Sequence, residues 1–435
     1  MATGIRSVSC DKYWLEDDGA AAMIDRSKPP YRVPSMTEIA RIKPNGLKVI
    51  STFAGCGGSS LGYRMAGFKV LWASEFIDAA RKVYEDNAAP GTIVDGRDIR
   101  LVDPLEVLRA LGLKPGELDV LDGSPPCSSF STAGKREEHW GKSKKYSDKE
   151  QRTDDLFFEY VRFIKAIKPR AFVAENVSGL VKGTAKGYFL EILAAMKACG
   201  YRVEARLLDA QWLGVPQARQ RIIFQGVRED VDAVPTFPAP FAYRYSVRDA
   251  IGDVGRIIGG NYANFALRGS VIPADMPSPA ITAGVHGGGP HQFYVEPETD
   301  ISKQAIGREY DKLNPGQASE KYFSLVRADA AEPCPTVTAA GGQNSGIACV
   351  VHPTEKRKFS IAELKRICGF PDDFALSGTY AQQWERLGRA VPPLMMKAIA
   401  ATLAEQLARG RPRTPSRAGG SPGRSTTARR PKGAG

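Results

Sequence analysis

Short apolar runs alternate with amphipathic segments from Leu47 to about Arg228. The apolar runs have the length of buried strands, and the segments between them have helical spacing, as at Leu156, Tyr160 and Ile164. Strands that alternate with helices predict a mostly parallel, doubly wound α/β sheet. The expected strands are 49–53, 69–73, one ending at 121, 171–174, 201–208 and 221–227, the last two forming a hairpin-like pair. The expected helices are one ending at 63, then 79–87, 156–167 and 188–199.

A second kind of sequence begins after Arg228. Residues 229–356 are rich in Gly, Pro and Thr and carry few helix signals, which predicts a smaller, irregular, mostly-β domain. Helix signals return at Ser360, an N-cap residue with Glu363 three positions later. A final helix is expected over 389–407, entered through Pro392 and Pro393. The expected division is a surface extension at 1–46, the α/β domain at 47–228, the smaller domain at 229–384, a returning helix at 385–408 and a disordered basic tail at 409–435.

The net charge points towards a polyanionic partner, but it is unevenly distributed along the chain. The formal charge is +12, and the eight basic residues of 409–435, a segment without an acidic residue, account for two thirds of it. This tail either solubilises the protein or contacts nucleic acid without sequence preference, and the composition favours neither reading over the other.

The composition also excludes several classes of protein. No apolar run reaches the length of a membrane span, and the polar N-terminus lacks the apolar region of a signal peptide. The seven cysteines form no CxxC pair, which argues against a zinc site or any other metal site built on cysteine pairs, and against a disulfide framework. We therefore expect a cytoplasmic protein without a metal.

A glycine-rich turn at 53–58 (FAGCGG) follows the first expected strand and opens a helix. Glycines at such a turn let the backbone approach a ligand closely. Glu75 ends the second expected strand, where dinucleotide-type folds present a carboxylate to ribose hydroxyls, and Asp98 follows a third element. These features favour a nucleoside-bearing cofactor, although the GxGxxG pattern of dinucleotide sites is absent.

A cysteine stands on a rigid turn where another apolar run ends. Pro125 and Pro126 stop the strand because their rings fix φ and they cannot donate to a ladder, and Cys127 follows them directly. The carboxyl end of a sheet strand is where open α/β folds bind ligands, so this position suits a nucleophilic thiol. Glu175 ends the strand expected at 171–174, and Arg219 with Arg221 could anchor a phosphate or a carboxylate.

Taken in order, these motifs resemble those of the DNA (cytosine-5) methyltransferases. The resemblance runs from about residue 49 to residue 407, and although each motif is modest, their order and spacing are highly specific. The matching set is Phe53-Ala-Gly-x-Gly-Gly, Glu75, Asp98, Pro126-Cys127, Glu175-Asn176-Val177, Gln217-x-Arg219-x-Arg221, Gly369-Phe370-Pro371 and Gly388-x-Ala390-Val391-Pro392. The resemblance implies a Rossmann-like S-adenosyl-L-methionine-dependent domain at 47–228 and a target-recognition domain at 229–384.

The resemblance also implies a mechanism. The family flips its target cytosine out of the duplex because the ring cannot be reached in the stack. Cys127 would attack C6 as a thiolate, and Glu175 would bind or protonate N3, so that C5 can take the methyl group. Arg219 or Arg221 would supply the positive charge that favours the thiolate.

The cofactor pocket that the resemblance implies is formed by separate segments of the chain. The glycine-rich turn would hold the methionine and adenosine parts, Glu75 the ribose, and Phe76 and Asp98 the adenine. The residues expected to bind the cofactor are Phe53, Gly55, Cys56, Gly58, Glu75, Phe76, Asp98, Ile99, Pro126 and Leu156. The basic segment 128–155 would be a mobile loop that closes on DNA.

The resemblance further suggests a bacterial or phage modification enzyme. We expect a monomer that acts on double-stranded DNA near the nucleoid and protects it from a separate restriction endonuclease. An RNA-directed member of the same fold and a catalytically inactive regulator are the alternatives, disfavoured by the long stretch 229–356 and by the presence of both Cys127 and Glu175. A cysteine hydrolase is disfavoured because none of the four histidines lies in a motif.

Three positions depart from the family pattern. Ser51 stands where an acidic residue is common, and Arg389 stands where an asparagine is usual. The segment before Leu156 reads Arg-Thr-Asp-Asp rather than the usual Arg-Gly. An arginine cannot replace an amide that both donates and accepts, so we expect altered cofactor contacts at these positions.

Overall fold

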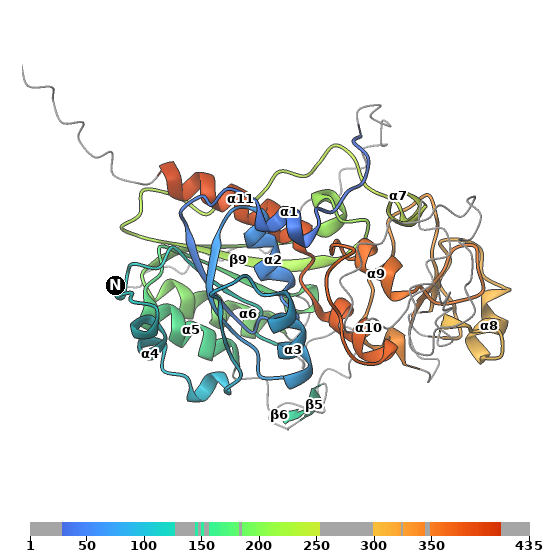
Figure 1. The fold of residues 1–435 in the computed structure, drawn as a ribbon, viewed down its shortest axis with the longest axis horizontal. Coiled ribbons are helices and arrows are strands. Elements are labelled where there is room, and N and C mark those ends of the chain that lie inside the picture. Colours follow the sequence, from blue (N-terminus) through green and yellow to red (C-terminus); the bar gives the residue numbers. More distant parts are fainter. Residues whose placement is uncertain are drawn as a thin grey trace, which may run out of the picture.

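The computed structural model describes residues 28–126, 144–146, 149–151, 156–181, 185–252, 299–322, 325–343 and 349–409. Cys127, most of the expected mobile loop and nearly all of the basic tail lie outside these residues. The described part forms a central sheet with helices on both faces and a smaller region beside it (Figure 1).

The central sheet has seven strands in the order β3-β2-β1-β4-β7-β9-β8. Five of them, from β3 to β7, pair in parallel, whereas β9 runs antiparallel to both β7 and β8. The strands are β1 (Lys48–Thr52), β2 (Lys69–Ser74), β3 (Ile93–Asp95), β4 (Val120–Gly123), β7 (Ala171–Val177), β8 (Tyr201–Asp209) and β9 (Gln220–Arg228). This arrangement confirms the prediction of a mostly parallel, doubly wound sheet with a hairpin-like pair at its end.

Helices cover the two faces of the sheet with separate apolar clusters. On one face α2 (Gly58–Met65) and α11 (Pro393–Arg409) pack over alternate residues of the strands. On the other face the layer consists of α4 (Pro104–Ala110), α5 (Leu156–Ile167) and α6 (Ala185–Lys197) (Figure 1). Helices α2 and α11 pack very closely: a Cβ on Gly62 of α2 would come within 2.6 Å of the Met396 Cβ of α11. Two remaining helices, α1 (Met36–Ala40) and α3 (Asp78–Asn87), lie at the side of the sheet that faces the smaller region.

The final helix begins at Pro393, one of the two prolines through which it was expected to be entered, and a separate helix that was not predicted precedes it. The chain forms α10 (Tyr380–Arg389), leaves the helical path at Ala390 with φ −63° and ψ 148°, and begins α11 at Pro393. Two consecutive prolines explain the break, because a proline disfavours helical geometry in the residue before it and is well tolerated at the first turn of a new helix.

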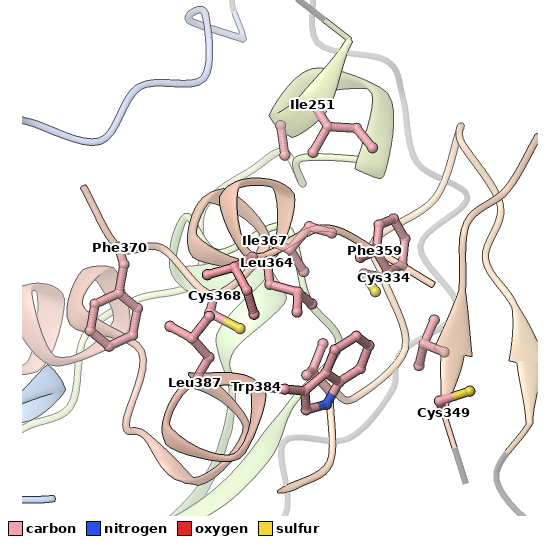
Figure 2. Packing of buried hydrophobic residues seen from close by; sticks show 14 of the residues in the cluster. Ile251, Cys334, Cys349, Phe359, Leu364, Ile367, Cys368, Phe370, Trp384 and Leu387 are labelled. Carbon is pink, nitrogen blue, oxygen red and sulfur yellow. The ribbon is translucent and has the colours of Figure 1, made fainter. Parts of the chain in front are cut away.

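The smaller region is built around a buried tryptophan. Trp384 of α10 packs with residues of α7 (Val247–Ile251), α9 (Ile361–Ile367) and the segments around Cys334 and Phe359 (Figure 2). Gly341 and Gly342 lie close against this residue: a Cβ on Gly341 would come within 2.6 Å of the Trp384 ring, and a Cβ on Gly342 within 2.7 Å of the Trp384 Cβ. The other elements are α8 (Ala305–Tyr310), β10 (Val326–Arg327) and β11 (Val350–Val351), so the described part of 229–384 contains more helix than a mostly-β region was expected to have.

The N-terminal segment 28–46 is fastened to the smaller region. Ile39 of α1 is buried in the same apolar cluster as Trp384. The Tyr31 hydroxyl donates to the carbonyl of Arg366 at 2.6 Å, and Lys28 forms an ion pair with Asp249 at 2.7 Å. The described residues of this extension thus lie on the surface, held there by these contacts, and Ile39 is the buried side chain among them.

Three parallel strands end side by side and set the geometry of the turn that leads to Cys127. The Thr52 hydroxyl of β1 donates to the carbonyl of Asp122 in β4 at 3.1 Å. The hydroxyl of Tyr160 lies 2.9 Å from the carbonyl oxygens of Leu121 in β4 and Val173 in β7 and donates to one at a time. Gly123 leaves room for this contact, because a Cβ there would come within 2.5 Å of the Tyr160 ring.

Replacing Tyr160 with Phe removes a buried hydroxyl that bridges two strands and leaves the shape of the core intact. We expect the free energy of unfolding to fall by about 1–2 kcal/mol, measured by urea denaturation. The matched control is Tyr322→Phe, whose hydroxyl makes no hydrogen bond within the described residues and whose effect should stay within about 0.5 kcal/mol. Equal effects of the two variants would show that the bridge does not hold β4 to β7.

Candidate active site

A buried carboxylate, that of Glu75, fixes the glycine-rich turn between β1 and α2 through a hydrogen bond. Glu75 follows β2, is 9% exposed, and accepts the backbone N–H groups of Gly55 at 2.8 Å and Ile77 at 2.7 Å. Burial raises the pKa of Glu75 above its ordinary value. Phe53 adopts a φ of 52°, rare for a residue with a side chain, and the space beside the Gly55 Cα is open. A strained turn with exposed backbone next to a buried acid suits a nucleoside-bearing ligand.

Three of the expected cofactor residues contribute apolar surface from separate elements. Ile99 and Leu156 are buried in the apolar cluster under the sheet, and Phe53 packs against that cluster from above the turn. Phe76 is half-buried directly after Glu75. Phe53, Ile99 and Leu156 thus belong to one apolar cluster, which does not include Phe76.

Asp98 lies at the start of a short 3-10 helix over Ile99–Leu101. Its carboxylate accepts the backbone N–H of Arg100 at 3.0 Å and pairs with the guanidinium of the same residue at 3.0 Å. The side chain is one quarter exposed, so it keeps free acceptor positions for a ligand. Pro126, the last described residue before Cys127, is half-buried at the end of β4.

Two residues of the glycine-rich turn have a packing role that the sequence did not reveal. The Cys56 thiol is buried, lies 3.6 Å from the carbonyl of Arg386 in α10, and has its pKa raised to about 12 by burial. Gly58 lies against the connection between α10 and α11, where a Cβ would come within 2.2 Å of the Val391 carbonyl oxygen. Only the backbone of Cys56 is therefore available to a cofactor, and Gly58 is required by the close approach of the last helices.

The turn that leads to Cys127 is tied to the neighbouring strand by an asparagine. The Asn176 side-chain amide at the end of β7 is buried and donates to the carbonyl of Pro125 at 3.0 Å. Its own carbonyl oxygen accepts the backbone N–H of Val177 at 2.8 Å. The sequence pattern included Asn176 but did not reveal this hydrogen bond. The bond fixes the position of Pro125, two residues before Cys127.

Glu175 and Arg221 form an ion pair at the same edge of the sheet. They lie on the adjacent strands β7 and β9, and the Arg221 Nε donates to Glu175 Oε1 at 2.8 Å. The two side chains are 12% and 13% exposed, respectively. Burial lowers the pKa of Arg221, while the adjacent carboxylate opposes that shift. The guanidinium of Arg221 is thus paired with a carboxylate of the protein itself.

Arg219, one of the two arginines expected to supply positive charge at the reacting thiol, makes its hydrogen bonds to backbone carbonyl groups. Its guanidinium is buried and donates to three carbonyl groups, those of Val337 at 3.2 Å, Gly388 at 2.9 Å and Ala390 at 3.0 Å. Burial lowers its pKa to about 9, so the group is still charged at neutral pH. This arginine joins the sheet to the smaller region and to the segment between α10 and α11.

The segment around Arg219 also pairs with residues 334–336. The backbone N–H of Ala218 donates to the carbonyl of Cys334 at 2.8 Å, and the Thr336 hydroxyl donates to the carbonyl of Ala218 at 2.6 Å. Arg389, where the family pattern has an asparagine, pairs with Glu385 one helical turn earlier at 2.8 Å. The backbone carbonyls on either side of Arg389, those of Gly388 and Ala390, accept hydrogen bonds from Arg219.

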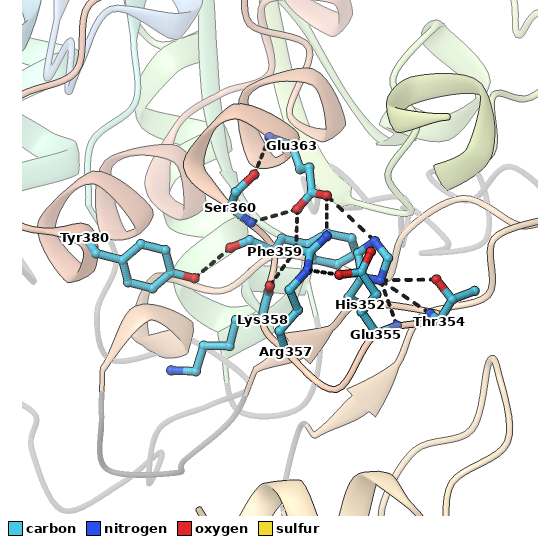
Figure 3. Close-up of polar contacts among 9 residues, drawn as sticks. All are labelled: His352, Thr354, Glu355, Arg357, Lys358, Phe359, Ser360, Glu363 and Tyr380. Atoms are coloured by element: carbon cyan, nitrogen blue, oxygen red, sulfur yellow. Dashed lines mark hydrogen bonds and ion pairs between the residues drawn. The ribbon is translucent and has the colours of Figure 1, made fainter. Parts of the chain in front are cut away.

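A second polar network organises the entry to α9 (Figure 3). Glu363 accepts both terminal nitrogens of Arg357 at 2.7 Å and the backbone N–H of Ser360 at 2.7 Å. Arg357 also pairs with Glu355 at 2.8 Å, and burial lowers the pKa of the nearby His352 to about 4, so this histidine is neutral at pH 7. The N-cap at Ser360 was predicted from the sequence, but the role of Arg357 in fastening it was not.

Comparison with known proteins agrees with this geometry. A family model described as C-5 cytosine-specific DNA methylase matches residues 47–405. The chain belongs to this family. The methylase is 30% identical over 385 residues to the Type II methyltransferase M.DdeI of Desulfomicrobium norvegicum, an alignment that covers 81% of the chain and 88% of that protein. It is 28% identical to the Type II methyltransferase M.Sau96I of Staphylococcus aureus, over 90% of the chain and 84% of that protein.

Solved structures give the same fold. A candidate DNA modification methyltransferase encoded within an E. coli prophage superposes with a TM-score of 0.59 at 23% identity, over 83% of this chain and all of that chain. A DNMT2 mutant from Spodoptera frugiperda superposes with a TM-score of 0.53 at 17% identity, also over 83% of this chain and all of that chain. The methylase is thus a DNA cytosine-5 methyltransferase of the Type II restriction-modification kind with a Rossmann-like α/β fold. Among its described helices, none is long and apolar enough to cross a membrane.

The two arginines of the motif should respond differently to replacement by lysine. Arg219→Lys loses the planar fork that reaches three carbonyls, and we expect the free energy of unfolding to fall by about 2–4 kcal/mol. Arg221→Lys keeps a charge beside Glu175, so stability should change by less than about 1 kcal/mol, whereas kcat should fall by about 10- to 100-fold as Glu175 shifts. Urea denaturation and a methylation assay measure the two quantities, and a reversed ranking would contradict the assignment.

Proposed function

We propose that this methylase transfers a methyl group from S-adenosyl-L-methionine to C5 of a flipped cytosine in a short duplex DNA sequence, through a covalent bond between Cys127 and C6. The observation that carries the proposal is the grouping at the carboxyl edge of β4 and β7. There the Glu175–Arg221 ion pair and the Asn176 tether lie next to the turn that ends at Pro126. Cys127 itself lies outside the described residues, so its role rests on its position directly after that turn.

The residues of the expected pocket fit S-adenosyl-L-methionine. The open space at Gly55 leaves the turn accessible, and Glu75 keeps two lone pairs after accepting Gly55 and Ile77. We propose that Glu75 holds the ribose, that Phe53 and Phe76 pack on the nucleoside, and that Asp98 accepts from its base. When bound there, the cofactor supplies an electrophilic methyl group.

The residues of the protein would act in an addition and a later elimination. The Cys127 thiolate adds to C6 while Glu175 binds or protonates N3, and the electron pair of the C5–C6 double bond becomes available at C5. That pair would form the bond to the methyl group, and the electrons of the broken sulfur–methyl bond would stay on the cofactor sulfur, which loses its positive charge. A base then removes the proton from C5, and the electrons of that C–H bond restore the double bond and expel the thiolate. Arg221 holds the Glu175 carboxylate in place, so it is a positioning residue for N3.

The remaining regions have proposed roles in DNA binding. Residues 229–384 would read the target sequence, the segment 128–155 would close over the flipped base, and the basic tail from 409 to 435 would contact phosphates. We further propose that the enzyme acts as a monomer on double-stranded DNA in the cytoplasm, and that it protects that DNA from a separate restriction endonuclease. The Type II names of its relatives support the proposed link to a restriction endonuclease.

Replacing Glu75 with Gln should weaken cofactor binding. A glutamine offers one oxygen where two backbone N–H groups need acceptors, so its amide would face one of these donors. We expect the dissociation constant for S-adenosyl-L-methionine to rise by about 10- to 100-fold, measured by calorimetry. Glu106→Gln, the same change at an exposed position, is the control and should leave the affinity unchanged. Equal affinities in the two variants would argue against a role for Glu75.

The reaction itself is tested by incubating the protein with S-adenosyl-L-methionine and unmethylated genomic DNA, followed by mapping of 5-methylcytosine at base resolution. We expect methylation at one short recurring sequence. Cys127→Ser should reduce turnover below detection while DNA binding persists. The control is Cys199→Ser, which changes a half-buried thiol in the loop after α6 and should retain turnover. Methylation by Cys127→Ser would show that Cys127 is not the nucleophile. No methylation by the wild type, with cofactor bound, would favour an RNA substrate or an inactive regulator.

A further inference from the structure

A buried carboxylate lies between the glycine-rich turn and the turn that leads to Cys127. Asp122 in β4 is 2% exposed, and its Oδ2 accepts the hydroxyls of Ser51 in β1 at 2.7 Å and Ser59 in α2 at 2.8 Å. Ser51 precedes the glycine-rich turn and Ser59 follows it. One carboxylate therefore holds both ends of that turn from the strand that continues into the Pro-Pro-Cys segment.

Within the part of the chain that the structure describes, no ion pair includes Asp122. Arg221, on the same edge of the sheet, is paired with Glu175. Four ionisable groups from the packed elements act on it, namely Glu175 of β7, Tyr63 of α2, Tyr84 of α3 and Tyr160 of α5. Burial, opposed by the two serine hydroxyls, raises the pKa of Asp122 to about 7. Ionisation of Asp122 becomes favourable when a positively charged group binds nearby.

The position of this carboxylate corresponds to a departure in the sequence. The family commonly has an acidic residue at position 51, whereas this chain has Ser51, whose hydroxyl lies against Asp122 at 2.7 Å. Val49 of β1 and Val120 of β4 are buried under α2 and α11, so Ser51 and Asp122, two residues further along each strand, project from that same face. Ser51 and Asp122 are therefore paired neighbours on the same face of the sheet.

We propose that Asp122 provides the acidic group of the cofactor pocket in place of an acid at position 51, and that it releases its proton when the cationic cofactor binds. The inference rests on the proposed use of S-adenosyl-L-methionine, whose sulfonium group carries a positive charge. Ionised Asp122 accepts the two serine hydroxyls more strongly than the neutral acid does, so binding of the cation and tightening of the glycine-rich turn reinforce each other. Asp122 is thus a positioning residue.

The test is calorimetric titration of the full chain with S-adenosyl-L-methionine in pairs of buffers that differ in ionisation enthalpy. The wild type should release about half a proton at pH 7, more at pH 6 and almost none at pH 8.5, because the free acid is protonated only below its pKa. Asp122→Asn should lose this release and bind about 10-fold more weakly. Asp119→Asn is the control: this carboxylate lies at the other end of the same segment, paired with Arg170 at 2.9 Å, and should not alter the release.

A second variant tests the relocation directly. Asp122→Ser should weaken binding, and adding Ser51→Asp to it should restore the affinity by returning the acid to β1; far-ultraviolet circular dichroism confirms that both variants fold. Equal proton release by wild type and Asp122→Asn, or no recovery in the double variant, overturns the inference while leaving the proposed function intact. Failure of the wild type to bind S-adenosyl-L-methionine at all overturns the proposed cofactor and, with it, this role of Asp122.

Discussion

The buried guanidinium of Arg219 is the contact on which the arrangement of the methylase depends. It connects the start of β9 with the carbonyls of Val337 in the smaller region and of Gly388 and Ala390 before the last helix. A charge removed from water without a carboxylate partner is costly unless dipoles surround it, and here three carbonyls supply them. Because the geometry of a planar fork is specific, this single group determines how two parts of the chain meet. The backbone pairing of Ala218 with Cys334 extends the same junction.

The chemistry at the edge of the sheet follows from strand order. Parallel β1, β4 and β7 end side by side, so Ser51, Asp122 and Glu175 approach one another although more than 120 residues separate the first from the last. Each is fixed by a neighbour on a different strand or helix, and the Asn176 amide does the same for the Pro125 carbonyl. The cofactor turn and the nucleophile turn are therefore parts of one hydrogen-bonded unit, and a shift in either is transmitted to the other.

Much of the fold could be predicted from the sequence because its signals are local. Apolar periodicity placed the strands and most helices, and Ser360 with Glu363 marked the start of α9. The prolines marked the entry of the final helix, but α10, which ends just before them, was not predicted. The direction of Arg219, the packing roles of Cys56 and Gly58, and the charge state of Asp122 depend on neighbours more than 60 residues away, and no local pattern encodes them.

The close contact of α2 with α11 has a consequence for how the protein is made. The two helices form one layer over the sheet, yet more than 300 residues separate Gly62 from its neighbour Met396. During translation the apolar face of α2 has no partner until the last helix has left the ribosome. The α/β part cannot complete its own core in the order in which it is synthesised, so nascent chains expose that face for most of their elongation. A chaperone that shields short apolar helices would be useful to this protein before its chemistry begins.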